Sequence, residues 1–159
     1  MTTTPDTSHV YLVRHAKAGS RDNWEGDDTL RPLSNAGRRQ AELLADRFAA
    51  IPTTRLLSSP YVRCVETLQP TAARLGGEVE EIGELTEGEP WEPALDLIGR
   101  VAAGTVLCSH GDLIPALIAA LERRGAEVRT PPDWRKATVW TLERNGDRVV
   151  AMSVAAPPA

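Results

Sequence analysis

Apolar positions along the chain form short continuous runs that alternate with segments of helical periodicity. Continuous apolar runs, such as residues 9–13 and 105–108, are typical of strands buried on both faces of a sheet. Within residues 35–50, Ala41, Leu44 and Phe48 recur at the spacing of one helix face, and Ser34 is the predicted N-cap. The same pattern predicts strands at residues 55–58 and 78–82, and helices at residues 60–75, 93–101 and 112–124.

The end of the chain follows a different pattern. Residues 136–143 and 148–154 read as two antiparallel strands joined across Asn145-Gly146, a pair typical of tight hairpin turns. Upstream, Pro70 lies inside a predicted helix and should kink or interrupt it. Strands and helices alternate over most of the chain. The predicted fold class is therefore α/β, a three-layer α/β/α architecture with a mostly parallel central sheet and an antiparallel edge strand.

One domain accounts for this pattern. The chain has 159 residues, 42% of them hydrophobic, which is enough for one core of ordinary size. We expect a flexible N-terminus at residues 1–8, followed by a single domain at residues 9–155.

Charge and cysteine content restrict the expected partners and compartment. A formal net charge of −4 at pH 7 gives no positive footprint for nucleic acid or an anionic membrane, so neither partner is expected. The two cysteines, Cys64 and Cys108, stand apart in apolar segments and form no CxxC motif. The polar start of the chain does not resemble a signal peptide, and no apolar run approaches the length of a membrane span, so a cytoplasmic location is expected. The oligomeric state stays open.

Chemistry-bearing residues follow three of the predicted strands. Arg14-His15 follows the first strand, Arg63 lies just after the second, and His110 lies just after the fourth. Because the carboxyl ends of parallel strands lie along one edge of a sheet, these side chains are expected to converge. Arginines can hold a tetrahedral anion, and an imidazole can attack its phosphorus. The pattern therefore predicts a site for a phosphoryl group.

Four motifs carry a resemblance to a known family. They are Leu12-Val13-Arg14-His15-Ala16, then Arg31-Pro32-Leu33-Ser34 with Gly37 and Gln40-Ala41, then Ser58-Ser59-Pro60-Tyr61-Val62-Arg63-Cys64-Val65-Glu66-Thr67, and finally Ser109-His110-Gly111. In this order, over roughly residues 9–145, they resemble the histidine phosphatase superfamily, in the branch that includes phosphoglycerate mutases. The short chain and Ala16 after the histidine are similar to compact SixA-type phosphohistidine phosphatases. The first loop also resembles the phosphatase-like half of actinobacterial two-domain Nudix hydrolases.

The resemblance implies a phosphoglycerate mutase-like fold and a role for each residue of the site. His15 would be the nucleophile that forms a phosphohistidine intermediate. Arg14 and Arg63 would clamp the phosphoryl oxygens, while His110 would donate a hydrogen bond to the transferring phosphoryl group. The general acid of the family often lies in a loop after the third strand. That position indicates Glu87, with Glu84 and Glu89 as nearby alternatives.

The polar loop at residues 17–33 is expected to shape the substrate pocket. The family often has a phosphate-contacting residue about six positions after the nucleophile, which falls on Arg21, with Ser20 beside it. Lys17 and Arg31 would add positive charge. Trp24 would stack on a base or, as the alternative, pack locally.

Three functions stay open, all with a phosphorylated partner. The first is a metal-independent phosphatase that removes a phosphoryl group from a phosphohistidine protein or a small phosphomonoester through a phosphohistidine intermediate. The second is a nucleoside di- or triphosphate phosphatase related to the Nudix-fused domains. The third, from another class, is a non-catalytic module that binds a phosphorylated ligand. No cofactor or metal is implied, because His9, His15 and His110 are not arranged as a chelating set.

Overall fold

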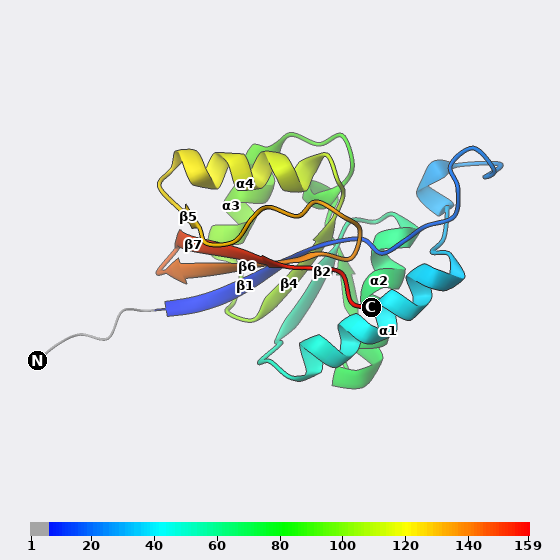
Figure 1. Ribbon diagram of the computed structural model, residues 1–159, viewed down its shortest axis with the longest axis horizontal. Helices are drawn as coiled ribbons and strands as arrows, with labels where there is room; N and C mark the ends of the chain where they lie inside the picture. The colour runs from blue at the N-terminus through cyan, green and yellow to red at the C-terminus, as the bar shows by residue number, and fades with distance from the viewer. Residues whose placement is uncertain (1–6) are drawn as a thin grey trace, which may run out of the picture.

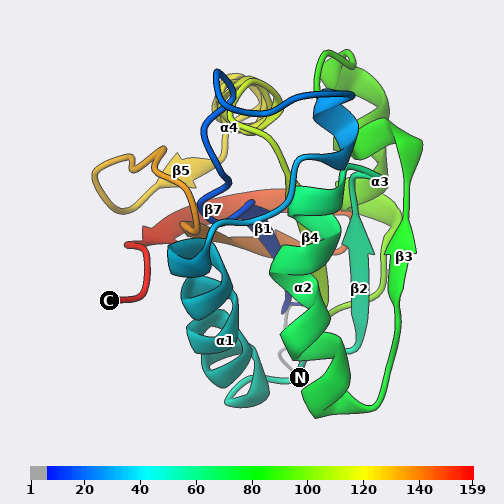
Figure 2. The same cartoon turned by 90° about the vertical axis from the view of Figure 1, so that its right-hand side faces the viewer.

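A mostly parallel sheet lies between two pairs of helices in the computed structural model, which describes residues 7–159 (Figures 1 and 2). The strands are β1 (Thr7–Arg14), β2 (Arg55–Ser58), β3 (Val79–Glu81), β4 (Thr105–Ser109), β5 (Glu127–Val128), β6 (Val139–Asn145) and β7 (Arg148–Ala155), in the spatial order β3-β2-β4-β1-β6-β7-β5. The helices are α1 (Asn35–Ala49), α2 (Val62–Leu75), α3 (Trp91–Arg100) and α4 (Leu113–Arg123), with short 3₁₀ turns η1 (Asp28–Leu30) and η2 (Gly83–Leu85). Strand β6 runs antiparallel to both of its neighbours, and the other pairs are parallel. The predicted fold class is confirmed.

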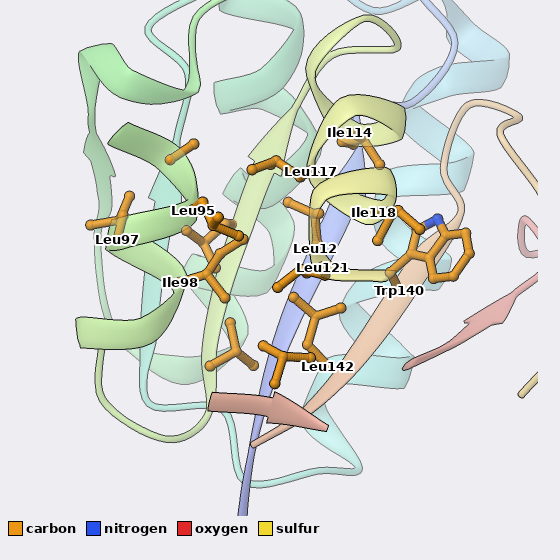
Figure 3. Close-up of a cluster of buried hydrophobic side chains, with 14 of the residues drawn as sticks. Leu12, Leu95, Leu97, Ile98, Ile114, Leu117, Ile118, Leu121, Trp140 and Leu142 are labelled. Atoms are coloured by element: carbon orange, nitrogen blue, oxygen red, sulfur yellow. The ribbon is translucent and has the colours of Figure 1, made fainter. Parts of the chain in front are cut away.

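Alternate residues of the central strand β1 face opposite helix layers. Leu12 belongs to a buried cluster that contains Leu117 of α4 and Leu142 of β6 (Figure 3). Its neighbour Val13 belongs to a second buried cluster, which contains Phe48 of α1. Successive side chains of a strand point to opposite faces, so a strand covered on both faces must be apolar at every position. This is why the run at the start of the sequence is continuous rather than alternating.

Helix α1 begins as the sequence predicts. The Ser34 hydroxyl accepts a hydrogen bond from the Gly37 backbone N–H at 3.1 Å, so Ser34 is the N-cap. A Cβ atom at Gly37 would lie 1.8 Å from the Lys17 carbonyl oxygen, so only glycine fits where α1 passes the first loop. Ser34 donates its own backbone N–H to the same carbonyl at 2.9 Å. The start of α1 and the loop after His15 are therefore locked together.

Helix α2 continues through Pro70 without a break, although the sequence predicts a kink or an interruption there. A proline inside a helix costs about 3 kcal/mol because it removes a hydrogen bond and crowds the preceding turn. Leu68 and Thr71, on either side of Pro70, are both buried. Their packing holds the helix together across the proline, and α2 ends at Gly76 in the left-handed conformation (φ 68°).

Several predicted boundaries are wrong. Thr7 and Ser8, assigned above to a flexible N-terminus at residues 1–8, belong to β1 and pair with Asn145 and Arg144 of β6, while residues 1–6 lie outside the described residues. The partner strand β6 extends far enough to pair with both, and the Arg144 side chain donates a hydrogen bond to the Ser8 hydroxyl at 3.0 Å. Strand β5 has only two residues and was not predicted.

Over residues 7–159, no helix is long and apolar enough to cross a membrane.

Candidate active site

Three parallel strands deliver the predicted site residues to one edge of the sheet. Arg14 is the last residue of β1 and pairs with Ser109, the last residue of β4. The ladder continues beyond both ends, because the His15 N–H donates to the Ser109 carbonyl at 3.1 Å. On the other side of β4, the Ser59 N–H donates to the Cys108 carbonyl at 3.0 Å. Sheet hydrogen bonds therefore fix the backbone of Arg14, His15 and Ser59, while Arg63 lies in the first turn of α2, four residues after Ser59.

His15 is held as a neutral imidazole with one nitrogen free. Its Nδ1 lies 2.9 Å from the Ala16 carbonyl oxygen. A carbonyl only accepts, so Nδ1 carries the proton and Nε2 keeps its lone pair. Burial, together with the smaller effect of the positive charges of His110, Arg63 and Arg14, lowers the pKa of His15 to about 3, against the raising effect of the Ala16 carbonyl. An unprotonated nitrogen is what a nucleophilic histidine requires.

His110 lies beside His15, with the two ring centroids 5.5 Å apart in an edge-to-face arrangement. It is fully buried, and its Nε2 lies 2.8 Å from the Ser59 hydroxyl oxygen and 3.6 Å from the Cys64 sulfur. The Tyr61 ring covers it edge-on at 4.7 Å. These contacts fix the imidazole in one orientation. Cys64 itself is fully buried and belongs to the second buried cluster, together with Val13 and Phe48.

The two predicted arginines are held by different partners. Arg63 is fully buried, and its two terminal nitrogens donate to the Asp28 carbonyl at 2.9 Å and to the Asp28 carboxylate at 3.2 Å. Arg14 donates from Nη1 to the Trp134 carbonyl at 2.5 Å. A Cβ atom at Gly111 would lie 2.6 Å from the Arg14 guanidinium carbon, so the guanidinium lies directly against the backbone of the residue after His110. A side chain in place of this glycine would push the Arg14 guanidinium out of its position.

Buried polar atoms without a partner concentrate at this site. In the part of the chain that the structure describes, five buried side-chain nitrogen or oxygen atoms have no hydrogen-bond partner, and three of them are Nε of Arg14, Nε of Arg63 and Nδ1 of His110. Leaving one such atom unsatisfied costs about 1–3 kcal/mol. All three residues are close enough to His15 to act on its pKa. Arg14 also lines the cavity described below, whereas Arg63 and His110 are not part of its lining.

A cavity of about 420 Å³ opens in front of His15. Its lining consists of Arg14, His15, Ala18, Gly19, Ser20, Arg21, Arg31, Glu87, Gly111, Asp112 and Lys136. The predicted pocket residues Ser20 and Arg21 are in this lining. Lys17 and Trp24 are not: Lys17 is exposed, and the Trp24 indole N–H donates to the Asp27 carbonyl at 2.8 Å within its own loop. Their roles in substrate binding stay predictions, and the contact of Trp24 is the local packing given above as the alternative.

Of the three acidic residues considered for the general acid, the structure brings one to the cavity. Glu87 lies 3.5 Å from Nη2 of Arg63 and 3.5 Å from Nη2 of Arg21, whereas Glu84 and Glu89 are exposed and outside the lining. Two hydrogen bonds hold its loop against the strand ends. The Ser109 hydroxyl donates to the Leu85 carbonyl at 2.7 Å, and the Gly88 N–H donates to the Asp112 carboxylate at 2.8 Å.

Comparison with known proteins agrees with this geometry. The family model described as "Histidine phosphatase superfamily (branch 1)" matches residues 10–94. The chain belongs to the histidine phosphatase superfamily.

Two curated relatives and one solved structure are similar to this superfamily member over different lengths. It is 34% identical to the 8-oxo-(d)GTP phosphatase of Mycolicibacterium smegmatis, over 96% of this chain and 49% of that protein. It is 36% identical to the serine/threonine-protein phosphatase PGAM5 of Rattus norvegicus, over 55% of this chain and 30% of that protein. The chain thus spans about half, or less, of the length of these curated relatives. The solved structure of the protein histidine phosphatase SixA complexed with tungstate superposes with a TM-score of 0.72 at 22% identity, covering 93% of this chain and 94% of that one, which shows a shared fold.

Arg31, expected to add positive charge, is in the cavity lining, but two further residues of the site were not predicted: Asp28 and Lys136. The Asp28 carboxylate accepts from Nε of Arg31 at 2.9 Å and from Arg63. Partial burial raises the pKa of Asp28, but the hydrogen bond from Arg31 and the charge of Arg63 outweigh it and lower the pKa below its ordinary value. The length of the polar loop at residues 17–33 was a signal for a functional lining, but the sequence gives no sign of which loop residue reaches α2. Lys136 was assigned to the first strand of the hairpin.

Metal-ligating side chains do not cluster at this site. Within residues 7–159, no group of three or more histidine, cysteine, aspartate or glutamate residues is arranged to hold a metal ion. The positive charges that act on His15 are those of His110, Arg63 and Arg14.

Proposed function

We propose that this chain is a metal-independent phosphatase that takes the phosphoryl group of its substrate onto Nε2 of His15 and then releases it to water. The observation that carries this proposal is the group of three buried, unpartnered nitrogens, on Arg14, Arg63 and His110, around a neutral buried imidazole. Preorganised donors that have no partner without a ligand are suited to stabilise charge that develops during phosphoryl transfer.

In the first step the phosphoryl oxygens accept hydrogen bonds from Nε of Arg14, Nε of Arg63 and Nδ1 of His110. The lone pair of His15 Nε2 forms a bond to phosphorus, and the bond between phosphorus and the leaving group breaks with its electron pair. Glu87 protonates a leaving group that needs a proton. In the second step the Glu87 carboxylate takes a proton from a water molecule, whose oxygen displaces His15 from phosphorus. Inorganic phosphate is formed and His15 returns to its starting state. Glu87 regains the proton that it gave to the leaving group or, where the leaving group took none, passes the proton from water on to the solvent.

Two substrate classes follow from this chemistry. A phosphohistidine on a protein, or a small phosphomonoester, fits the open cavity and the SixA-like fold. A nucleoside di- or triphosphate is the second candidate, because the relative that aligns with 96% of the chain is named 8-oxo-(d)GTP phosphatase. Both classes present a terminal phosphoryl group to the same donors.

The test is hydrolysis of p-nitrophenyl phosphate in the presence of EDTA by the wild type and by His15→Ala. We expect the wild type to turn over and His15→Ala to lose at least about 10³-fold in kcat/KM, because the nucleophile is gone. His9→Ala is the matched control, since His9 is an exposed histidine earlier on β1. Intermediate trapped by denaturation in alkali, where the N–P bond of phosphohistidine is stable, should carry phosphate on a histidine in the wild type and in His9→Ala only.

Other outcomes discriminate the alternatives. Equal rates in the wild type and His15→Ala would overturn the assignment of the nucleophile. Turnover that is lost with EDTA and restored by Mg²⁺ would overturn metal independence. No turnover with aryl phosphates, phosphohistidine protein or nucleotides, together with tight binding of inorganic phosphate, would indicate the non-catalytic binding module.

A further inference from the structure

Lys136 is a cavity-lining cation that the phosphoryl chemistry leaves unused. It lies in the segment before β6 and lines the cavity together with Arg21 and Arg31. Arg31 is paired with Asp28, and Arg21 approaches both Asp28 and Glu87. Lys136, in contrast, makes no hydrogen bond or ion pair with any residue in the described range 7–159.

The surroundings of Lys136 are positively charged. Burial lowers its pKa, and the charges of Arg14, Arg31, Lys17 and Arg63 lower it further. An ordinary surface lysine would turn toward solvent or toward a carboxylate. A half-buried lysine facing other cations is stabilised when an anion lies between them.

The backbone around Lys136 is held in a strained conformation next to the nucleophile. Ala137 has a φ of 67°, the only positive φ of a non-glycine residue in the described chain, and it is fully buried. Its N–H donates to the carbonyls of both Arg14 and His15, at 3.1 and 3.2 Å. From the same segment, the Trp134 carbonyl accepts from the Arg14 side chain. The segment that carries Lys136 is thus fastened to the catalytic strand at three points.

The cavity is also larger than one phosphoryl group needs. Its volume of about 420 Å³ lies within the roughly 300–1,000 Å³ range of pockets for whole small-molecule ligands. The donors without partners on Arg14, Arg63 and His110 suffice for the transferred phosphoryl group. Lys136 is therefore available for a second anionic group, next to the first.

We propose that Lys136 binds a second phosphate of the substrate, joined through an anhydride oxygen to the phosphoryl group that His15 attacks, and so selects nucleoside di- or triphosphates over monoesters. This inference rests on the proposed phosphatase function and narrows its substrate class. When the bond between the terminal phosphorus and the anhydride oxygen breaks, the electron pair stays on that oxygen, which becomes part of the departing phosphate. The Lys136 ammonium neutralises this added charge without a metal ion. The departing phosphate needs no proton, so this step depends little on Glu87, which acts in the second step, when water displaces His15 from phosphorus.

The experiment compares GDP, GMP and p-nitrophenyl phosphate as substrates, in EDTA, for the wild type and Lys136→Met. We expect the wild type to prefer GDP, and Lys136→Met to lose about 10–100-fold in kcat/KM for GDP, as loss of one charge-assisted contact predicts. For GMP and p-nitrophenyl phosphate the change should stay within about 3-fold. Arg135→Gln is the matched control, because Arg135 directly precedes Lys136 in the chain but is exposed, pairs with Asp133 and lies outside the cavity lining. It should leave all three substrates within about 2-fold.

A binding measurement separates this inference from the phosphatase proposal. In a His15→Ala background, pyrophosphate should bind more tightly than phosphate by calorimetry, and Lys136→Met should remove that difference while Lys136→Arg retains part of it. Equal losses for GDP and p-nitrophenyl phosphate, or no loss for either, would overturn the role of Lys136 and leave the phosphatase intact. No turnover of any substrate by the wild type would overturn the phosphatase proposal instead. Unchanged thermal unfolding of Lys136→Met, or the same selectivity loss in Lys136→Gln, shows that the effect does not come from misfolding.

Discussion

Removing the buried imidazole of His15 should change how the stability of the protein responds to acid. The unfolded chain takes up a proton on His15 as the pH falls below the ordinary pKa of 6.5, whereas the folded chain resists protonation until about 3. Between these values the unfolded state binds more protons than the folded state. The contribution of His15 to stability is therefore fully present above about pH 6.5, declines as the pH falls, and is lost below about pH 3.

The size of the effect follows from these two values. Between about pH 7.5 and about pH 4.5, a group with a pKa of 6.5 in the unfolded chain and about 3 in the folded chain removes roughly 2.5 kcal/mol from the free energy of unfolding. His15 is only 5% exposed, so solvent does little to screen this effect. Other groups also titrate in this range. Their contribution cancels when the wild type is compared with His15→Gln at both pH values.

Urea unfolding at the two pH values measures this difference directly. The wild type should lose roughly 2.5 kcal/mol more than His15→Gln on acidification, while His9→Gln, an exposed histidine of the same strand, should behave as the wild type. ¹⁵N NMR of the imidazole nitrogens gives a second readout, with a proton on Nδ1 and none on Nε2 of His15 down to about pH 4. Equal pH dependence in all three proteins, or a His15 signal that titrates near 6.5, would refute the reasoning.

Three further changes test other parts of the structure. Gly111→Ala places a Cβ 2.6 Å from the Arg14 guanidinium carbon, so kcat/KM for p-nitrophenyl phosphate should fall about 10–100-fold at unchanged thermal stability; full activity would show that Arg14 does not need that position. Glu87→Gln should lower kcat/KM about 100-fold for alkyl phosphates, whose leaving group needs a proton, but less than about 3-fold for p-nitrophenyl phosphate; equal losses would indicate that Glu87 only positions Arg63. Arg144→Met removes buried hydrogen bonds to the Ile98 and Val101 carbonyls, and urea unfolding should show a loss of about 2–4 kcal/mol with activity retained, whereas a loss under about 0.5 kcal/mol would contradict the role of these bonds.

The part of the site that the sequence predicts is the part that the sheet positions. Arg14, His15 and His110 directly follow buried strands, so the apolar runs locate them and the topology of a parallel sheet brings them together. Helix signals were equally local: the Ser34 cap and the Gly76 stop need only their neighbours in the chain. Where local signals conflicted with packing, as at Pro70, packing decided the structure.

The residues that were missed depend on contacts between distant segments. Asp28 reaches Arg63 across 35 positions of sequence, and no periodicity or motif encodes that pairing. The sequence pattern predicts that a strand begins at Lys136. The left-handed conformation of Ala137 interrupts the extended backbone, so β6 begins only at Val139 and Lys136 lines the cavity. A positive φ at an alanine cannot be predicted from residue type, because alanine disfavours it. The extra two residues of β1 likewise depend on the length of its partner β6.

Different parts of the fold supply the side chains proposed to hold the transferred phosphoryl group and those proposed to contact the leaving group. The side chains proposed to hold the transferred phosphoryl group come from strand ends and the first turn of α2. Sheet hydrogen bonds hold the backbone of Arg14 and His15, and the side chains of His15, Arg63 and His110 are buried, which leaves them little freedom. Those that face the leaving group, Arg21, Glu87 and Lys136, come from three separate loops that meet at the cavity. Loops tolerate substitution better than buried strand ends. Substituting these three residues should therefore change the substrate class while His15 and its donors stay in place. Arg21 and Glu87 form ion pairs with charged side chains of the described residues, whereas Lys136 forms none, so substituting Lys136 leaves no other charge unpaired.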